Sequence, residues 1–412
     1  MPSPHPSASP KLALTFILIT VCLDAIGIGL IFPVMPRLIA EVTGGSLSQA
    51  ALWGGILSTS YAVMQFLFGP VVGSLSDRFG RRPVLLCSLV VMSADYLLMA
   101  LAPTMALLLL ARLIAGIASS TYATALAYIA DITPEAERAP RFGLIGAGFG
   151  IGFVLGPAIG GLLAGVDTRA PFFAAAAMAA ANLALGWWVL PETVTEATRR
   201  RFSLARANPL GALGAVSRLP GLRRPLAVFL ILGIAMNVYP SVWAYYGQAR
   251  FGWGEGMVGA SLALYGIAFA AGQVALVRPA IARFGEHRAV VLGIWVDIVT
   301  LTGYGLVTSG LAALLITPVT ALGGVVTPSL QAILSRAAPA DAQGELQGVL
   351  ASLNAIAMIV SPLVMTGAFS AFTGPAAPVF APGAPFLLAA LMMVAAMLLH
   401  VAGPRDPRVE PT

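Results

Sequence analysis

Residues 73–83 read GSLSDRFGRRP and stand between two apolar stretches, 50–72 and 84–102, each of a length that can cross a bilayer. The glycines permit a tight turn, and Asp77 faces several arginines across a short loop. The pattern predicts a charged hairpin loop between two membrane helices. The alternative interpretation is a solvated turn that carries positive charge only because of its orientation.

The rest of the chain continues this alternation of long apolar and short polar stretches. Of its 412 residues, 58% are hydrophobic and only 10% are charged, whereas soluble domains carry about 25% charged residues. Gly, Pro and charge clusters divide the sequence into twelve apolar segments. These lie near 11–35, 50–72, 84–102, 104–130, 142–165, 170–190, 225–248, 257–279, 289–308, 311–334, 346–370 and 384–402. We therefore predict an all-α membrane protein with twelve transmembrane helices.

The longest polar stretch, 191–224, separates six apolar segments from the next six and is interpreted as a linker. It divides the chain into two predicted bundles, 11–190 and 225–402. The bundles resemble each other weakly, because RFGRRPVLL (78–86) precedes Asp95 and RFGEHRAVV (283–291) precedes Asp297. Such duplicated halves, with a site between them, are common in transporters. The Pro/Ser-rich residues 1–10 and the end, 403–412, are expected to be tails, the first of them disordered.

The distribution of basic residues predicts the orientation. If both termini are cytoplasmic, every basic residue except Arg37, Arg112, Arg169 and Arg250 falls on the cytoplasmic side. This asymmetry also accounts for the net charge of +6, so a nucleic-acid partner is not expected.

Three acidic residues, Asp24, Asp95 and Asp297, lie inside apolar segments, and Arg112 lies in a fourth. A rise of about 1.5 Å per residue places all four near the middle of the bilayer. A carboxylate there costs about 2.5–3.5 kcal/mol on insertion scales, so the default interpretation is a polar path through the membrane. We therefore predict proton-coupled transport. The alternative is that one aspartate forms an internal salt bridge with Arg112 and has a purely structural role.

Other polar residues in the spans are candidates to line that path. Gln65 and Gln273 place amides in the second and eighth segments, and Asn354 either lines a cavity or forms an interhelical hydrogen bond. Cys22 and Cys87 both fall within spans, so neither a disulfide framework nor a metal site is expected. The chain has no H-E-x-x-H or G-x-S-x-G motif, which argues against a membrane-embedded enzyme.

The fifth segment is rich in small residues. Gly152, Gly156 and Gly160 recur every four positions, and Pro157 lies among them. This spacing lets helices approach closely, and the proline can kink the helix.

Several of these stretches resemble a known family. GSLSDRFGRRP is similar to the loop signature of the major facilitator superfamily, and G-x-x-x-G-P-x-x-G-G (152–161) is similar to the fifth-helix signature of its drug/proton antiporters. Further segments resemble the tetracycline efflux antiporters of that superfamily. They are LDAIGIGLIFPVMP (23–36), YAVMQFLFGPVVG (61–73), AYIADIT (127–133), APFFAAAA (170–177), LPET (190–193), RFGW (250–253), TPSLQAILS (327–335) and QGELQGVLASL (343–353). Together they span nearly the whole chain.

The resemblance implies the major facilitator fold, two pseudo-symmetric six-helix bundles, and a role for each matching residue. Asp24, Asp95, Asp297 and Arg112 match the residues that handle protons and the drug cation. Gln65 and Gln273 match substrate-binding amides, to which Asn237, Phe269 and Asn354 are added as candidates. Asp77, Arg78, Arg81 and Asp131 match a charge-paired cytoplasmic gate. Two positions depart from the family: Phe269 stands where relatives can carry a histidine, and Asn237 replaces a glutamine, with Pro240 shifted by one residue.

The implied function is efflux of a tetracycline-type antibiotic, in exchange for protons, across the cytoplasmic membrane of a bacterium. The proton gradient would drive it without a cofactor, and Mg²⁺ would arrive only as part of the drug chelate. The expected partners are the small-molecule drug and membrane lipid, and the protein is expected to be a monomer. The departures at Phe269 and Asn237 leave open a phenicol, another lipophilic cation or a metabolite as the exported compound. A nutrient symporter of the same fold is disfavoured by the fifth-helix signature.

Overall fold

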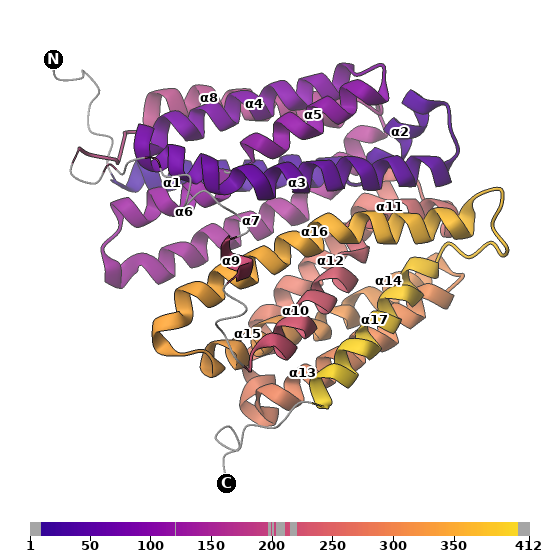
Figure 1. The fold of residues 1–412 in the computed structure, drawn as a ribbon. Helices are drawn as coiled ribbons and strands as arrows, with labels where there is room; N and C mark the ends of the chain where they lie inside the picture. Colours follow the sequence, from indigo (N-terminus) through magenta and orange to yellow (C-terminus); the bar gives the residue numbers. More distant parts are fainter. Residues whose placement is uncertain are drawn as a thin grey trace, which may run out of the picture. The chain divides into compact units, whose positions relative to one another are not determined.

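The computed structural model describes residues 10–119, 121–196, 199, 202, 211–214 and 221–402. All regular secondary structure among these residues is helical (Figure 1). The chain forms two compact units. The first comprises Met1–Pro209 with Gly247–Gly266, and the second comprises Leu210–Tyr246 with Ile267–Thr412. The predicted tails, apart from Pro10, and most of the predicted linker lie outside the described residues, so the predicted domain boundaries stay predictions.

Within the described residues, twelve helical stretches are long and apolar enough to span a membrane, which confirms the predicted fold class. The first six consist of α1 (Pro10–Ile31), α3 (Leu47–Phe79), α4 (Arg81–Leu101), α5 with α6 (Met105–Ala118 and Thr121–Ile132), α7 (Glu135–Ala164) and α8 (Ala170–Val189). The short α2 (Met35–Thr43) follows α1.

The remaining six spans follow the polar stretch, in which α9 (Gly211–Gly214) lies. They consist of α10 with α11 (Arg223–Met236 and Val238–Phe251), α12 (Glu255–Ala275), α13 (Val277–Leu306), α14, η2 and α15 in series (Gly310–Thr320, Ala321–Val325 and Val326–Ala337), α16 (Gln343–Thr373) and α17 (Ala384–Val401). A 3-10 turn, η3 (Ala340–Ala342), precedes α16.

Glycine ends the helices at both copies of the Arg-Phe-Gly sequence. Gly80 has φ 114° and separates α3 from α4, and Gly285 has φ 72° and breaks α13 near its start. A positive φ is accessible to glycine at little cost and is strained for other residues. The weak sequence repeat between the two halves is thus matched by the same backbone break in each.

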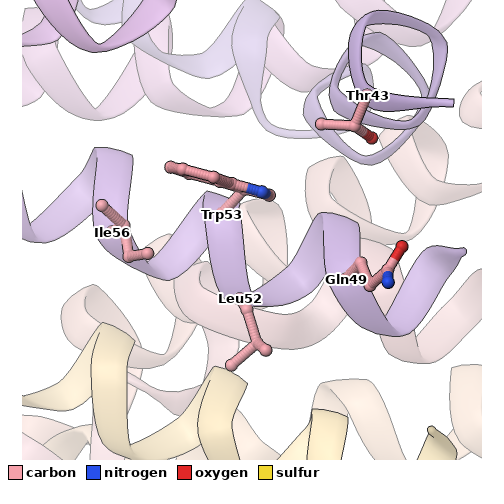
Figure 2. Close-up of a pocket in the computed structure, with 5 residues that line it drawn as sticks. All are labelled: Thr43, Gln49, Leu52, Trp53 and Ile56. Carbon is pink, nitrogen blue, oxygen red and sulfur yellow. The ribbon is translucent and has the colours of Figure 1, made fainter. Parts of the chain in front are cut away.

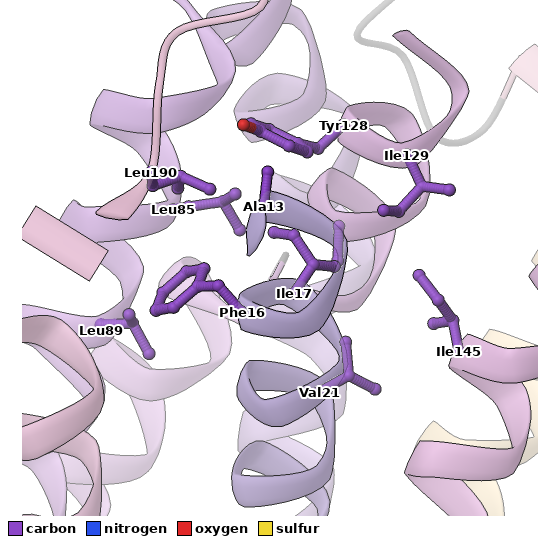
Figure 3. Close-up of a cluster of buried hydrophobic side chains, with 11 residues drawn as sticks. Ala13, Phe16, Ile17, Val21, Leu85, Leu89, Tyr128, Ile129, Ile145 and Leu190 are labelled. Carbon is purple, nitrogen blue, oxygen red and sulfur yellow. The ribbon is translucent and has the colours of Figure 1, made fainter. Parts of the chain in front are cut away.

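A core of buried side chains in the first unit surrounds the beginning of α1 (Figure 3). Phe16 and Ile17 of α1 pack with Leu85 of α4, Tyr128 of α6 and Ile145 of α7. Lipid is as apolar as these side chains, so the association of helices depends on close packing more than on hydrophobic transfer.

Helices α1 and α7 of this unit pack closely, and the glycines of α7 make the approach possible. A Cβ atom on Gly152, Gly156 or Gly160 would collide with the carbonyl oxygens of Cys22, Ile26 and Leu30, respectively. The four-residue spacing in α7 therefore matches a four-residue spacing of carbonyls on α1.

Candidate functional site

A buried ion pair lies in the first unit. Asp95 of α4, of which 4% is exposed, accepts a hydrogen bond through Oδ2 from Arg112 Nη2 of α5. The same nitrogen lies 2.7 Å from the sulfur of Met99. Asp95 Oδ1 and Arg112 Nε are buried and have no hydrogen-bond partner among the described residues. The pair is thus neutral overall and incompletely satisfied.

Two tyrosines extend this cluster toward α1. The Arg112 guanidinium lies over the ring of Tyr61 at 5.7 Å, and a Cβ on Gly27 of α1 would collide with the hydroxyl of Tyr96. Asp24 lies on α1 one turn before Gly27. Asp24 is half-buried and forms no hydrogen bond or ion pair with any described residue. The structure therefore pairs Asp95 with Arg112 and packs α1, the helix of Asp24, against Tyr96 of the same α4.

Gln65 lies beside this cluster on α3. Its amide Nε2 donates to the carbonyl oxygen of Ser119, just after the end of α5, at 3.4 Å. The close approach of α3 and α5 depends on Gly116, because a Cβ there would lie 2.7 Å from Met64 Cβ. Sequence reasoning did not identify Tyr61 or Tyr96; aromatic residues in apolar spans give no separate signal.

Asp297 of α13 has a different environment in the second unit. Only 3% of it is exposed, and its Oδ1 has no hydrogen-bond partner among the described residues. A Cβ on Gly323 would collide with its carboxylate, so the acid lies directly against the backbone of η2. A 3-10 turn between two α-helices is a frequent feature of hinges and functional sites.

No described cation of the second unit pairs with Asp297. Asp95 and Asp297 follow the two copies of the Arg-Phe-Gly sequence at similar distances along the chain. Of these two acids, Asp95 pairs with a cation and Asp297 pairs with none among the described residues.

Two predicted substrate-binding residues also lie against η2, at Gly324. Gln273 Nε2 donates to the Gly324 carbonyl at 3.1 Å, and the ring of Phe269 would lie 3.1 Å from a Cβ on Gly324. Both residues come from α12, and 37% of Phe269 is exposed. The structure thus groups Phe269, Gln273 and Asp297 around one helix break.

Asn237 and Asn354 do not join this group through any hydrogen bond among the described residues. Asn237 ends α10, where its amide nitrogen donates to the Gly233 carbonyl at 2.8 Å. Its own carbonyl accepts from Ser241 at 2.6 Å. The Asn237 side chain therefore binds the last turn of α10, at the break between α10 and α11. Asn354 is exposed on α16.

The predicted gate residues form a network at the α3–α4 loop. Arg81 pairs with Asp77 at 2.7 Å and with Asp131 of α6 at 3.1 Å, and Thr193 donates to the same Asp131 oxygen at 3.1 Å. Arg78 forms no ion pair among the described residues, and its guanidinium lies 5.1 Å from the ring of Phe79. Arg81, not Arg78, is thus the centre of the network.

A residue that sequence reasoning missed, Glu192, completes this loop. Its two carboxylate oxygens accept from the backbone N–H groups of Arg81 and Arg82 at 2.9 and 3.2 Å. An acid at the start of α4 satisfies N–H groups that have no intrahelical partner and interacts favourably with the helix dipole. The only sequence signal was its place in LPET (190–193), a segment noted for its resemblance and not for a contact.

The second unit contains an ion pair that corresponds to Arg81–Asp131, with the positions of the acid and the base exchanged. Glu286, which follows Gly285 as Arg81 follows Gly80, pairs with Arg336 at the end of α15. The same number of residues separates Arg81 from Glu286 and Asp131 from Arg336. Each half therefore ties its Arg-Phe-Gly loop to the end of a later helix through one ion pair. Aligning the two RFG sequences would have identified this second pair.

A separate cavity of about 380 Å³ lies at the other end of α3 (Figure 2). Thr43 of α2 and Gln49, Leu52, Trp53 and Ile56 of α3 line it. Gln49 also belongs to the capping box that starts α3, with Ser46. None of the predicted site residues reaches this cavity. The described residues contain no group of three or more His, Cys, Asp or Glu side chains suited to a metal ion.

Comparison with known proteins assigns the family. Residues 17–362 match the Major Facilitator Superfamily. The class C tetracycline resistance protein of Escherichia coli is 42% identical over 359 residues, which cover 87% of this chain and 90% of that protein. The class G protein of Vibrio anguillarum is 39% identical, with coverage of 87% and 90%. Multidrug resistance protein 2 of Bacillus subtilis is 27% identical, with 80% of each chain covered.

Solved structures agree with this assignment. The human organic anion transporter MFSD10 has a TM-score of 0.68 at 25% identity, covering 95% of this chain and 99% of the other. A mutant of the nucleoside transporter NupG has a TM-score of 0.75 at 13% identity, covering 95% and 100%, and supports the fold alone. The resemblance predicted from sequence is confirmed. The chain belongs to the major facilitator superfamily, with tetracycline resistance proteins among its relatives, and is a transporter rather than an enzyme.

Proposed function

We propose that this protein exports a tetracycline-type antibiotic, bound as its magnesium chelate, in exchange for protons. The family match and the tetracycline resistance relatives support a multi-pass transporter of the bacterial inner membrane. Proton exchange, the chelated form of the drug, cytoplasmic termini and a monomeric state are parts of the proposal.

The observation that carries the proposal is the uncompensated carboxylate of Asp297. A buried carboxylate without a cation is costly when ionised, so it favours either a proton or a positively charged ligand. A magnesium chelate with net positive charge and a proton would compete for the same oxygens. Because each ligand displaces the other, their exchange is coupled.

The remaining polar residues have supporting roles in this mechanism. Asp24, half-buried and without a described partner, is a second group that can take a proton or a cation. Asp95 pairs with Arg112 and positions that guanidinium beside Tyr61. Gln273 and Phe269 offer an amide and an aromatic face next to Asp297. An ionised, unloaded Asp297 would oppose movement of its charge through the membrane, which limits leak.

Transport into inverted membrane vesicles tests the proposal. We expect uptake of tetracycline only with Mg²⁺ and an imposed pH gradient, accompanied by drug-dependent proton release. Asp297→Asn should abolish both. Asp341→Asn, which removes an exposed carboxylate in η3, should leave them unchanged. Retained drug-dependent proton release in Asp297→Asn would refute the assigned role.

A second candidate is export of a different drug by the same mechanism. The exposed ring of Phe269 beside Asp297 and the similarity to a multidrug resistance protein favour it. A susceptible strain that expresses the protein would be tested against tetracyclines, phenicols and lipophilic cations. Resistance to the latter two without resistance to tetracyclines would favour this candidate.

A further inference from the structure

A groove on the surface of the first unit contains none of the candidate acids or gate residues in its lining. It has a volume of about 690 Å³ and is formed by the first turns of α4 and the last turns of α8. Its lining runs from Arg82 to Val90 on α4 and from Trp188 back to Ala180 on α8. Eight residues of helix correspond to about 12 Å, so the groove extends from a loop end well into the hydrocarbon region.

The two ends of the groove differ in chemistry. Most of the lining is aliphatic, with small residues such as Ala180 and Ala184 opposite Val90. At the loop end are Arg82 and two tryptophans, Trp187 and Trp188, with exposed fractions of 59% and 83%. Tryptophan is enriched at the level of the lipid headgroups, where its ring and its N–H are both accommodated.

The charge of Arg82 is not neutralised by a described carboxylate. Its Nη2 donates to the carbonyl of Trp187 at 2.8 Å, and its guanidinium lies 5.5 Å from the Trp187 ring. Its Nε is buried without a hydrogen-bond partner among the described residues. Glu192 binds the backbone N–H of Arg82 and forms no ion pair with its guanidinium. A positive group at the mouth of an apolar groove therefore lacks an anion.

We propose that this groove binds an anionic phospholipid, with its phosphate at Arg82 and one acyl chain along the α4–α8 groove. Basic pockets between membrane helices are suited to anionic headgroups, and the apolar lining is suited to the chain. A guanidinium–phosphate contact is a charge-assisted hydrogen bond, which is strong where water is scarce. The site does not depend on the proposed transport function.

Native mass spectrometry of the delipidated full chain in detergent tests this assignment. Phosphatidylglycerol would be titrated in, with phosphatidylcholine as the zwitterionic control. Both lipids carry a phosphate, but the choline ammonium of phosphatidylcholine neutralises it, so we expect the first phosphatidylglycerol to bind about fivefold more tightly. Arg82→Gln should remove this preference and Arg82→Lys should keep part of it. Inorganic phosphate at millimolar concentration should not displace the lipid; displacement would mean an anion site without a lipid, and would overturn the proposal.

A groove-filling variant tests the acyl-chain part while leaving Arg82 intact. Ala184→Trp should reduce phosphatidylglycerol binding as strongly as Arg82→Gln. Ala181→Trp is the matched control, because Ala181 is exposed on the same helix and does not line the groove. Equal binding by the original protein, Ala184→Trp and Arg82→Gln would overturn the proposal.

Cys87 supplies a second measurement, since it is exposed and lines the groove. With Cys22 replaced by serine, Cys87 is the single thiol of the chain. We expect phosphatidylglycerol to slow its alkylation by a maleimide. A cysteine at position 181, made as Ala181→Cys in a chain that also carries Cys87→Ser, should react at the same rate with and without lipid. Unprotected Cys87 at saturating phosphatidylglycerol would contradict a chain lying in the groove.

Discussion

Arg112 on α5 donates a hydrogen bond to the buried carboxylate of Asp95 on α4, and the two charges compensate each other inside the first unit. Removing one partner of such a pair leaves an unpaired buried charge, which costs about 3–5 kcal/mol. We expect Arg112→Ala to lower the thermal stability of the detergent-solubilised protein by this order.

The double variant Asp95→Asn with Arg112→Gln should recover much of that stability, because no buried charge remains. Arg37→Ala is the control, since the Arg37 side chain is half exposed and an exposed pair contributes about 1 kcal/mol or less. Equal losses from Arg37→Ala and Arg112→Ala would mean that the buried pair has no special importance.

Asp297 is held against Gly323, and this contact predicts a difference between two adjacent glycines. Gly323→Ala would push the carboxylate away from η2, whereas Gly324→Ala would meet the movable ends of Phe269 and Gln273 at 3.1 and 3.2 Å. A displacement of about 1 Å at a reacting group can cost a hundredfold in rate, so we expect Gly323→Ala to reduce drug-dependent proton release by about tenfold or more. Gly324→Ala should reduce it less. The measurement is proton release from inverted vesicles, normalised to protein amount; the reverse order would count against the importance of the contact.

The Glu286–Arg336 ion pair has its charges in the opposite order to the Arg81–Asp131 pair, and this can be tested by exchanging them. Arg336→Glu places a second acid beside Glu286, of whose side chain only 10% is exposed, and should destabilise the second unit by about 1 kcal/mol or more. Adding Glu286→Arg restores opposite charges, in the arrangement that Arg81 and Asp131 have in the first unit. We expect the double variant to regain most of the loss in thermal unfolding. A double variant no more stable than Arg336→Glu alone would show that the charges do not interact.

The sequence predicted the spans well because bilayer thickness imposes long apolar runs, and each of the twelve segments overlaps a helical stretch. It did not predict the breaks within spans. The break at Asn237 depends on a side-chain hydrogen bond to Gly233, and η2 is packed against Asp297, so both depend on local or tertiary contacts without a composition signal.

The sequence could indicate which residues belong to the candidate site, but not which of them contact one another. Depth along the helices indicated Asp24, Asp95, Asp297 and Arg112 equally, and spacing could not decide which acid would pair with the arginine. Glu192 was missed because its partners lie more than a hundred residues away along the chain.

Two glycines of the first unit should respond differently to alanine. Gly80 has φ 114°, and a Cβ there would collide with the Glu192 carboxylate, whereas a Cβ on Gly73 would meet open space. Gly80→Ala should therefore strain the loop and displace the acid that binds the start of α4. Gly73→Ala should be neutral or stabilise α3 by about 0.5–1 kcal/mol through helix propensity. Thermal unfolding of the two variants checks this; a loss of stability in Gly73→Ala equal to that in Gly80→Ala would contradict the argument.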